Sequence, residues 1–314
     1  KKNLKDLFID KIYINDLMKI VKTLPFKPTK VVKSIANSLH TGSIYKLSLL
    51  DINDTNNFRY SATFSEISVS NTNNLSIVGL SGQLLGNNIK GKLTLNSKNI
   101  EVIPDKFSKY DLSEINGLVN YQLKNNELSI SSNKLIIDKS HSVKVSGVLA
   151  TNKSKLKLNV KGDMDKILNK FQKKDLTSML SQNVSITSKY ELDYRIYRYG
   201  SKTNSFGVID FKDLVISNKD LNLTFNSKHM RINFFDKYLQ SHKNQYYMNN
   251  NEFHFYLNTQ MINKSMRYSI DSNGVLTSSF LKNTIKNKLL KSFDGKSLIN
   301  FSIMYEPKTN KIFT

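Results

Sequence analysis

The chain has 314 residues, 39% of them hydrophobic, which is enough to bury a substantial core in two compact domains or in one extended architecture. It carries 47 Lys and Arg against 25 Asp and Glu, and the formal net charge of +22 favours anionic partners. The lysines are scattered through a sequence rich in Asn, Ile and Ser, so charge alone defines no basic patch. The absence of Cys excludes disulfides and thiolate zinc sites, and no window reaches the roughly 18 uninterrupted apolar residues of a membrane-spanning helix.

The first predicted elements are helical. The segments "DLMKIVKT" (Asp16 to Thr23) and "TKVVKSIANSLH" (Thr29 to His40) place apolar residues at helical spacing. Asp16 suits the start of the first helix, and Pro28 followed by Thr29 suits the start of the second. We therefore predict a helical insertion near residues 16–40.

A glycine-rich run follows in "VGLSGQLLGNNIKGKLTLNSKNI" (Val78 to Ile100). Its glycines are Gly79, Gly82, Gly86 and Gly91. Strict alternation then begins with Leu93 and Leu95, and neither a closing Lys-Ser/Thr nor a helix is present to make a phosphate-binding loop. We expect a turn with positive φ and a sharp bend ahead of a strand, at positions where a β-carbon would clash.

Period-two alternation of apolar and polar residues dominates the rest of the chain. The alternating sets are Gly117, Val119, Tyr121 and Leu123; Val143, Val145, Gly147 and Leu149; Leu156, Leu158 and Val160; Tyr190, Leu192, Tyr194 and Ile196; Leu221, Leu223 and Phe225; Phe253, Phe255 and Leu257; and Phe301, Ile303 and Tyr305. Short polar turns at 124–126, 151–154 and 217–220 separate several of these sets. The pattern predicts a mainly β protein with minor α: a long, curved antiparallel meander sheet whose apolar side forms an open hydrophobic groove.

Two further helical insertions are predicted near residues 163–182 and 278–293. The first, which starts at Asp163 and continues after Asp175, repeats the strand-to-helix layout of residues 12–26. We therefore expect two β-groove units, 1–150 and 151–314, the first with the insertion near 16–40 and the second with the other two.

No catalytic cluster is visible in the sequence. The five histidines, His40, His141, His229, His242 and His254, are far apart and are expected in turns or on solvent faces. Glu191 and Asp193 should share an exposed strand face with Arg195, where cross-strand charge pairing is expected rather than glycosidase chemistry. We predict that the chain is not an enzyme, that it needs no cofactor or metal, and that it does not bind nucleic acid, because its aromatics share the apolar parity of strands.

With these elements in order, the sequence resembles the AsmA-like proteins, most closely their YhdP-type branch. The resemblance is carried by residues 58–107, with the strand, glycine run and "Gly-x-Leu-x-Leu" return, by the hairpins of 112–150, and by "FDGKSLINFSIMYEP" (Phe293 to Pro307). It implies an inner-membrane-anchored protein that spans the bacterial periplasm and conducts phospholipids to the outer membrane, supporting its lipid homeostasis and barrier function. The sequence contains no anchor helix, so we expect a monomeric interior fragment of a longer chain that reaches both membranes through other parts.

The alternation independently favours a groove, because an apolar sheet face must be covered by a second layer or by something else, such as phospholipid acyl chains. The residues expected to line this groove are Leu93, Leu95, Val119, Tyr121, Leu123, Val143, Val145, Leu156, Leu158, Val160, Leu192, Tyr194, Ile196, Leu221, Leu223, Phe225, Phe253, Phe255 and Leu257. The alternative is a non-enzymatic structural or adhesive β-solenoid or sandwich of a cell-envelope protein, in which the same side chains fill a dry core.

Overall fold

A computed structural model describes residues 5–23, 30–54, 58–70, 75–104, 109–150, 152–171, 184–220, 222–262, 265–284, 294–307, 309 and 311–313. The fold is mainly β, as the alternation predicted. Over these residues, 18 strands form an open antiparallel meander sheet, interrupted by four short helices.

The chain divides into two units, described separately below. Unit 1 comprises Lys1–Val160 and Arg195–Thr203, and unit 2 comprises Lys161–Tyr194 and Asn204–Thr314. The main boundary therefore falls slightly later in the chain than the predicted division between residues 150 and 151.

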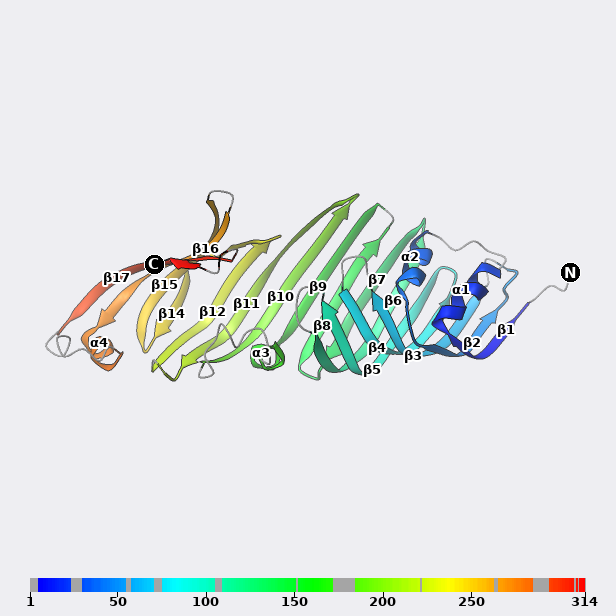
Figure 1. The fold of residues 1–314 in the computed structure, drawn as a ribbon, viewed down its shortest axis with the longest axis horizontal. Coiled ribbons are helices and arrows are strands. Elements are labelled where there is room, and N and C mark those ends of the chain that lie inside the picture. The colour runs from blue at the N-terminus through cyan, green and yellow to red at the C-terminus, as the bar shows by residue number, and fades with distance from the viewer. Residues whose placement is uncertain are drawn as a thin grey trace. The chain divides into compact units, whose positions relative to one another are not determined.

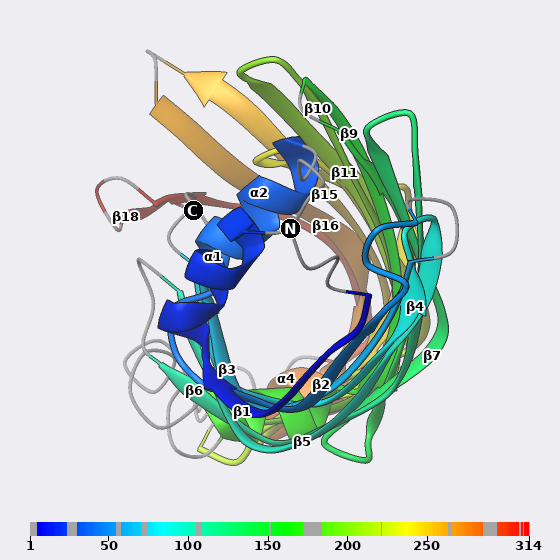
Figure 2. The same cartoon turned by 90° about the vertical axis from the view of Figure 1, so that its right-hand side faces the viewer.

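Unit 1 is a run of consecutive antiparallel neighbours that begins at the N-terminal end of the chain (Figure 1). Its elements are β1 (Leu7–Tyr13), α1 (Ile14–Thr23), α2 (Lys30–Ser38), β2 (Ser43–Leu50), β3 (Arg59–Ser70), β4 (Leu75–Asn87), β5 (Lys90–Pro104), β6 (Tyr110–Lys124), β7 (Glu127–Ile137), β8 (His141–Leu149) and most of β9 (Lys153–Asp163). Seen from the β1 end, its strands bend along their length, and α1 and α2 lie on the side toward which they bend (Figure 2).

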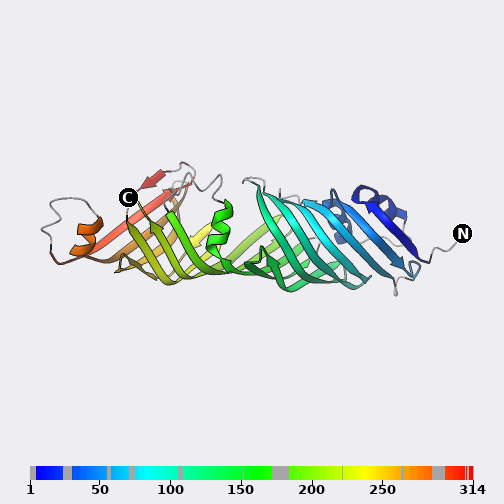
Figure 3. The ribbon, with the colours of Figure 1, turned by 90° about the horizontal axis from the view of Figure 1, so that it is seen from below.

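Unit 2 is also a meander of antiparallel neighbours, and its strands run side by side in Figures 1 and 3. Its elements are α3 (Met164–Phe171), most of β10 (Val184–Tyr199) and of β11 (Lys202–Asn218), β12 (Leu223–Phe235), β13 (Tyr238–Gln240), β14 (Asn244–Met248), β15 (Asn251–Ile262), β16 (Ser265–Thr277), α4 (Ser278–Thr284), β17 (Lys296–Glu306) and β18 (Lys311–Phe313). Strands β13 and β14 both pair with β12 and together occupy the place of one strand.

Paired asparagines close two of the hairpins. Asn125 and Asn126 have φ of 51° and 61° between β6 and β7, and Asn249 and Asn250 have φ of 44° and 67° between β14 and β15. Two consecutive left-handed residues match the right-handed twist of the flanking strands, and Asn tolerates this conformation. The predicted turn at 124–126 is therefore confirmed.

Each predicted helical insertion contains a helix that follows a strand directly. Helices α1, α3 and α4 begin at the residues that follow β1, β9 and β16. Asp163 immediately precedes α3, as expected for an N-cap, whereas α1 begins at Ile14, so Asp16 lies in its first turn. Three parts of the predicted insertions lie outside the described part of the chain: residues 24–29 with Pro28 and Thr29, residues 172–182 with Asp175, and residues 285–293.

The glycine-rich run differs from its prediction. Gly79, Gly82 and Gly86 lie within β4 rather than in a turn, and Asn88 and Ile89 connect β4 to β5. Of these three glycines only Gly79 has a positive φ, 94°. A β-carbon at Gly82 or Gly86 would clash with a neighbouring strand, as predicted. These glycines therefore allow close packing between strands.

Candidate functional site: the apolar face

The strand register of unit 1 gathers apolar side chains on one side of the sheet. One cross-strand row contains Ala62, Leu84, Leu93 and Val119, and the next contains Phe64, Gly82, Leu95 and Gly117. We call this side the apolar face and the opposite side the polar face. Five predicted lining residues of unit 1, Leu93, Leu95, Val119, Tyr121 and Leu123, lie together on the apolar face.

These five side chains are half-buried, while their strand neighbours on the polar face, such as Lys92, Thr94 and Asn120, are exposed. The described residues of unit 1 form a packed cluster of buried apolar side chains over β1–β3, but none of its members comes from β4–β8. A one-sided apolar sheet normally hides that side against another layer. The apolar face is therefore partly open around Leu93, Leu95 and Val119, whereas Ile100 and Val102, beyond the bulge in β5, are 0% and 6% exposed.

A line of backbone irregularities crosses unit 1 and bends its strands. Lys46, Glu66, Gly79, Asn99 and Gly117 have positive φ on five successive strands, β2 to β6. Register shifts interrupt the β2–β3, β3–β4, β4–β5, β6–β7 and β7–β8 pairings near them. Bulges of this kind kink a strand and curve its sheet. The bend in Figure 2 therefore has a local cause in each of β2 to β6.

Serine hydroxyls satisfy the backbone groups that the irregularities leave without a ladder partner. Ser97, fully buried, accepts a hydrogen bond from the Ser81 N–H at 2.9 Å and donates to the Ser81 carbonyl at 3.0 Å. In unit 2, Ser188 donates to the Lys212 carbonyl at 2.9 Å, beside Asp213 with φ of 51°. A buried polar group is tolerated where it makes such hydrogen bonds. Serines can therefore occupy strand positions whose side chains are otherwise apolar and face the core side.

Aromatic rings lie over glycines of the neighbouring strand on the apolar side. A β-carbon at Gly91 would lie 2.1 Å from the Tyr121 hydroxyl, and one at Gly82 would lie 2.8 Å from Phe64 Cζ. In unit 2, one at Gly274 would lie 2.3 Å from Phe253 Cδ1. Each aromatic residue is the direct cross-strand partner of its glycine. The rings cover backbone that glycine leaves bare, a known way of stabilising glycine in sheets.

Two tyrosine hydroxyls meet above this glycine row. Tyr60, Gly86, Gly91 and Tyr121 are consecutive cross-strand partners, and the Tyr60 and Tyr121 hydroxyls hydrogen-bond to each other. Burial, together with this hydrogen bond, raises the pKa of Tyr121 well above 10, and burial also raises the pKa of Tyr60. Both hydroxyls therefore stay neutral at physiological pH, as suits groups beside an apolar surface.

Helix α1 covers the first strands of unit 1. The buried cluster there contains Ile12, Leu47, Leu49, Ile52, Phe58 and Ala62. Leu17 of α1 and Tyr60 of β3 pack against it. The amphipathic helix that sequence spacing predicted thus closes one end of the apolar face.

Unit 2 fills the corresponding side with aromatic rings. Tyr246 stacks on Phe225 and Phe253, with ring centroids 4.4 and 5.3 Å apart, and meets Phe255 edge-on at 5.8 Å. Phe253 is 1% exposed, and Phe280 of α4 packs into the same cluster. Phe253, Phe255 and Leu257, predicted to line an open groove, are therefore packed core residues, because large rings on adjacent strands fill the space between them.

The other predicted lining residues have mixed surroundings. Leu223 and Phe225 pack against the aromatic cluster, and Val143 is buried. The half-buried members are Val145 in β8, Leu156, Leu158 and Val160 in β9, and Leu192, Tyr194 and Ile196 in β10. Leu221 lies outside the described residues.

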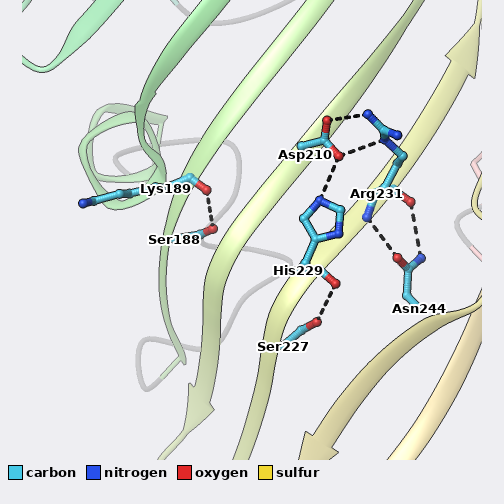
Figure 4. Close-up of polar contacts among 7 residues, drawn as sticks. All are labelled: Ser188, Lys189, Asp210, Ser227, His229, Arg231 and Asn244. Atoms are coloured by element: carbon cyan, nitrogen blue, oxygen red, sulfur yellow. Dashed lines mark hydrogen bonds and ion pairs between the residues drawn. The ribbon is translucent and has the colours of Figure 1, made fainter.

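Polar side chains form structural pairs across strands. Asp210 accepts hydrogen bonds from Arg231 through both carboxylate oxygens, at 2.9 and 3.0 Å, and lies 3.1 Å from His229 Nε2 (Figure 4). Ser227 donates to the His229 carbonyl rather than to its ring, so no nucleophile is activated there. Glu191 pairs with Lys161 at 2.8 Å, in agreement with the predicted charge pairing.

The histidine prediction needs one correction. His40, His229 and His242 are exposed, and the side chain of His254 is partly exposed at 26%. His141 is 7% exposed, however, and its Nδ1 lies 2.8 Å from the Ser140 hydroxyl. It starts β8 directly after the β7–β8 turn and is buried because it shares the strand parity of Val143, which is also 7% exposed.

Searches against protein-family models, curated proteins and solved structures each returned no match. The described residues contain no group of three or more His, Cys, Asp or Glu placed to hold a metal ion. Among them no helix is long and apolar enough to cross a membrane.

Sequence reasoning missed the residues that shape the apolar face. Tyr60, Leu84 and the serines of the bend were absent from the predicted set, although Tyr60 hydrogen-bonds to Tyr121 and Leu84 is the cross-strand partner of Leu93. A signal for the bend exists in "LTLNSKNIEV", where apolar parity passes from Leu93 and Leu95 to Ile100 and Val102. Such a change of parity within one strand indicates an extra residue, which is a bulge.

Proposed function

We propose that this chain is a non-enzymatic, lipid-conducting β-segment, in which phospholipid acyl chains lie along the apolar face. The observation that carries the proposal is the half-buried apolar surface of Leu93, Leu95, Val119, Tyr121 and Leu123 on β5 and β6 of unit 1, opposite an exposed polar surface. Burying a methylene group against such a surface contributes about 0.8 kcal/mol and needs no fixed polar partner. A passive conduit requires this kind of interchangeable lining rather than a shaped, polar binding site.

The wider setting follows from the resemblance to AsmA-like proteins of the YhdP branch. In that setting the chain belongs to a periplasmic protein anchored in the inner membrane, and it supports phospholipid supply to the outer membrane. The antiparallel meander and the short helices that follow its strands support this setting, because a meander can be extended strand by strand without closing on itself.

The test is lipid occupancy of the purified chain, measured by native mass spectrometry and by lipid extraction. Leu95→Lys places a charge on the apolar face between Gly82 and Gly117, where it should exclude most of the bound lipid. Thr94→Lys is the matched control, because Thr94 is the exposed neighbour on the polar face of the same strand.

The proposal predicts lipid in the native chain and in Thr94→Lys and a loss in Leu95→Lys, with circular dichroism and thermal unfolding unchanged. A native chain free of lipid would contradict it. If Leu95→Lys unfolds, Leu95 is a core residue. The lipid measurement is then repeated with Val145→Glu on β8, where loss of lipid from a folded protein supports the proposal and retention of lipid contradicts it.

A structural or adhesive β-domain remains the second candidate, and the aromatic cluster of unit 2 favours it. Phe253, Phe255 and Tyr246 are buried within the chain itself, as in a self-supporting domain. If unit 1 also excluded lipid, this candidate would explain the fold without a conduit.

A further inference from the structure

A hollow of about 740 Å³ lies on the polar face of unit 1. Its floor is one cross-strand row, formed by Tyr60, Gly86, Gly91, Tyr121 and Ile130 on β3 to β7. The Tyr60 and Tyr121 side chains belong to the apolar face, so toward the hollow this row presents backbone. The hollow is therefore separate from the proposed lipid surface and lies on the other side of the same strands.

The walls are the residues before and after each floor residue, whose side chains point to the polar face because strand side chains alternate. They include the amides of Asn120 and Gln122 and four serine hydroxyls. Leu50 and Leu85 add apolar contact, and Leu85 is 60% exposed. Apolar atoms make up most of the exposed lining, and the amides and hydroxyls add several hydrogen-bond donors and acceptors among them.

Every charged side chain that lines the hollow is a cation. Arg59 and Lys90 belong to one wall and Lys92 belongs to the other. The Asn87 side chain accepts hydrogen bonds from the Ile89 and Lys90 N–H groups, which fixes the hairpin that carries both lysines. Arg59 pairs with Asp51 at 3.0 Å, so the two lysines carry the uncompensated charge of the site.

A similar hollow in unit 2 shows that this charge is not simply a result of the chain's composition. It measures about 440 Å³ and is built in the same way, around Ser272 and Phe301 on neighbouring strands. Its charged side chain is Asp271, which accepts a hydrogen bond from Ser302 at 2.6 Å, and neither Lys nor Arg lines it. The two polar-face hollows therefore have opposite charge in a chain of net charge +22.

We propose that the polar-face hollow of unit 1 binds an extended acidic glycan. The hollow runs from β2 to β7, five inter-strand steps of about 4.8 Å each, or about 24 Å, which accommodates several sugar units. Amides and hydroxyls complement sugar hydroxyls, and Lys90 and Lys92 complement carboxylate or sulfate groups. Single-stranded nucleic acid fits less well, because the rings of Tyr60 and Tyr121 face the other side and offer no stacking surface.

The test is calorimetric titration of the intact chain with a sulfated heparin octasaccharide, with a neutral dextran oligosaccharide for comparison. Lys90→Ala/Lys92→Ala should weaken heparin binding about tenfold or more, because both charge-assisted contacts are lost. Lys98→Ala/Lys144→Ala is the matched control: it removes the same charge from exposed positions on β5 and β8 outside the hollow, and should change binding less than about twofold.

A second variant, Asn120→Ala/Gln122→Ala, tests the amides without changing charge. Its loss of affinity should persist at high salt, since neutral hydrogen bonds are not screened. Equal losses in the two lysine variants would overturn the proposal in favour of net charge alone. Tighter binding of an oligonucleotide or of anionic vesicles, abolished in Lys90→Ala/Lys92→Ala, would also overturn it, as would absence of heparin binding.

Discussion

The two units use the same alternation of residues and reach different surfaces. In unit 1, Leu93, Leu95 and Val119 alternate with polar residues and stay half-buried. In unit 2, Phe253 and Phe255 alternate in the same way and are 1% and 7% exposed. Parity decides which side a residue faces, and the side chains that pack over that side decide how far the residue is buried. Around Leu93, Leu95 and Val119 the face stays partly open, whereas Phe225, Tyr246 and Phe253 on adjacent strands pack on one another.

The largest expected loss of stability tests the aromatic cluster of unit 2. Phe253→Ala removes a ring stacked on Tyr246 and lying over Gly274, and should lower the free energy of unfolding by about 3–5 kcal/mol. Leu93→Ala, the equivalent change in unit 1, should cost about 1 kcal/mol, because much of the side chain already faces solvent. Urea unfolding of both variants measures the difference, and equal losses would mean that the two faces are packed alike.

The next effect concerns the glycine rows that both units share. A β-carbon at Gly82 would lie 2.0 Å from the Thr94 carbonyl oxygen, so Gly82→Ala should cost roughly 1–3 kcal/mol through strand displacement. Gly200, with φ of 58° and open space around it, provides the control. Gly200→Asn should change thermal stability by less than about 0.5 kcal/mol, because Asn tolerates the left-handed region. A stable Gly82→Ala protein would show that the bend tolerates wider strand spacing.

A smaller effect is expected for the tyrosine pair of unit 1, whose contribution to stability depends on pH. Tyr60 and Tyr121 have folded-state pKa values raised above 10, so the unfolded chain loses these protons first as pH rises. Their contribution to stability is complete below about pH 10 and is lost above it. Tyr121→Phe should cost about 1 kcal/mol at pH 8 and should reduce the further loss between pH 8 and 11. An unchanged alkaline slope, measured by urea unfolding at both pH values, would place the titration elsewhere.

The smallest effect is expected on the polar side of unit 2. Arg231 is 53% exposed where it pairs with Asp210, so Arg231→Ala should lower stability by only about 0.5 kcal/mol. Chemical denaturation at low and high salt would detect this small, screened contribution. A loss near that of Phe253→Ala would contradict the assignment of stability to the aromatic cluster.

The sequence was sufficient to predict the meander, because strand parity and turn residues are local properties. The strands around Val119, Val143 and Phe253, the Asn125–Asn126 turn and the strand-to-helix steps at α1, α3 and α4 all follow from neighbours in the chain. The side chains that pack over each face could not be predicted from neighbouring residues in the sequence. Phe225, Tyr246 and Phe253 meet only after strands pair, and the Tyr121 ring covers Gly91 because of register. The glycine run was misplaced for the same reason: its purpose is contact with other strands.

The most direct test of the account is to map where lipid tails touch the chain. A phospholipid with a diazirine in its acyl chain would be incorporated, photolysed and located by peptide mass spectrometry. The account predicts adducts on apolar-face residues of β4–β8, such as Leu93, Leu95 and Val119, and none on the buried ring of Phe253. Adducts confined to exposed side chains of the polar face, or spread equally over both sides, would contradict it.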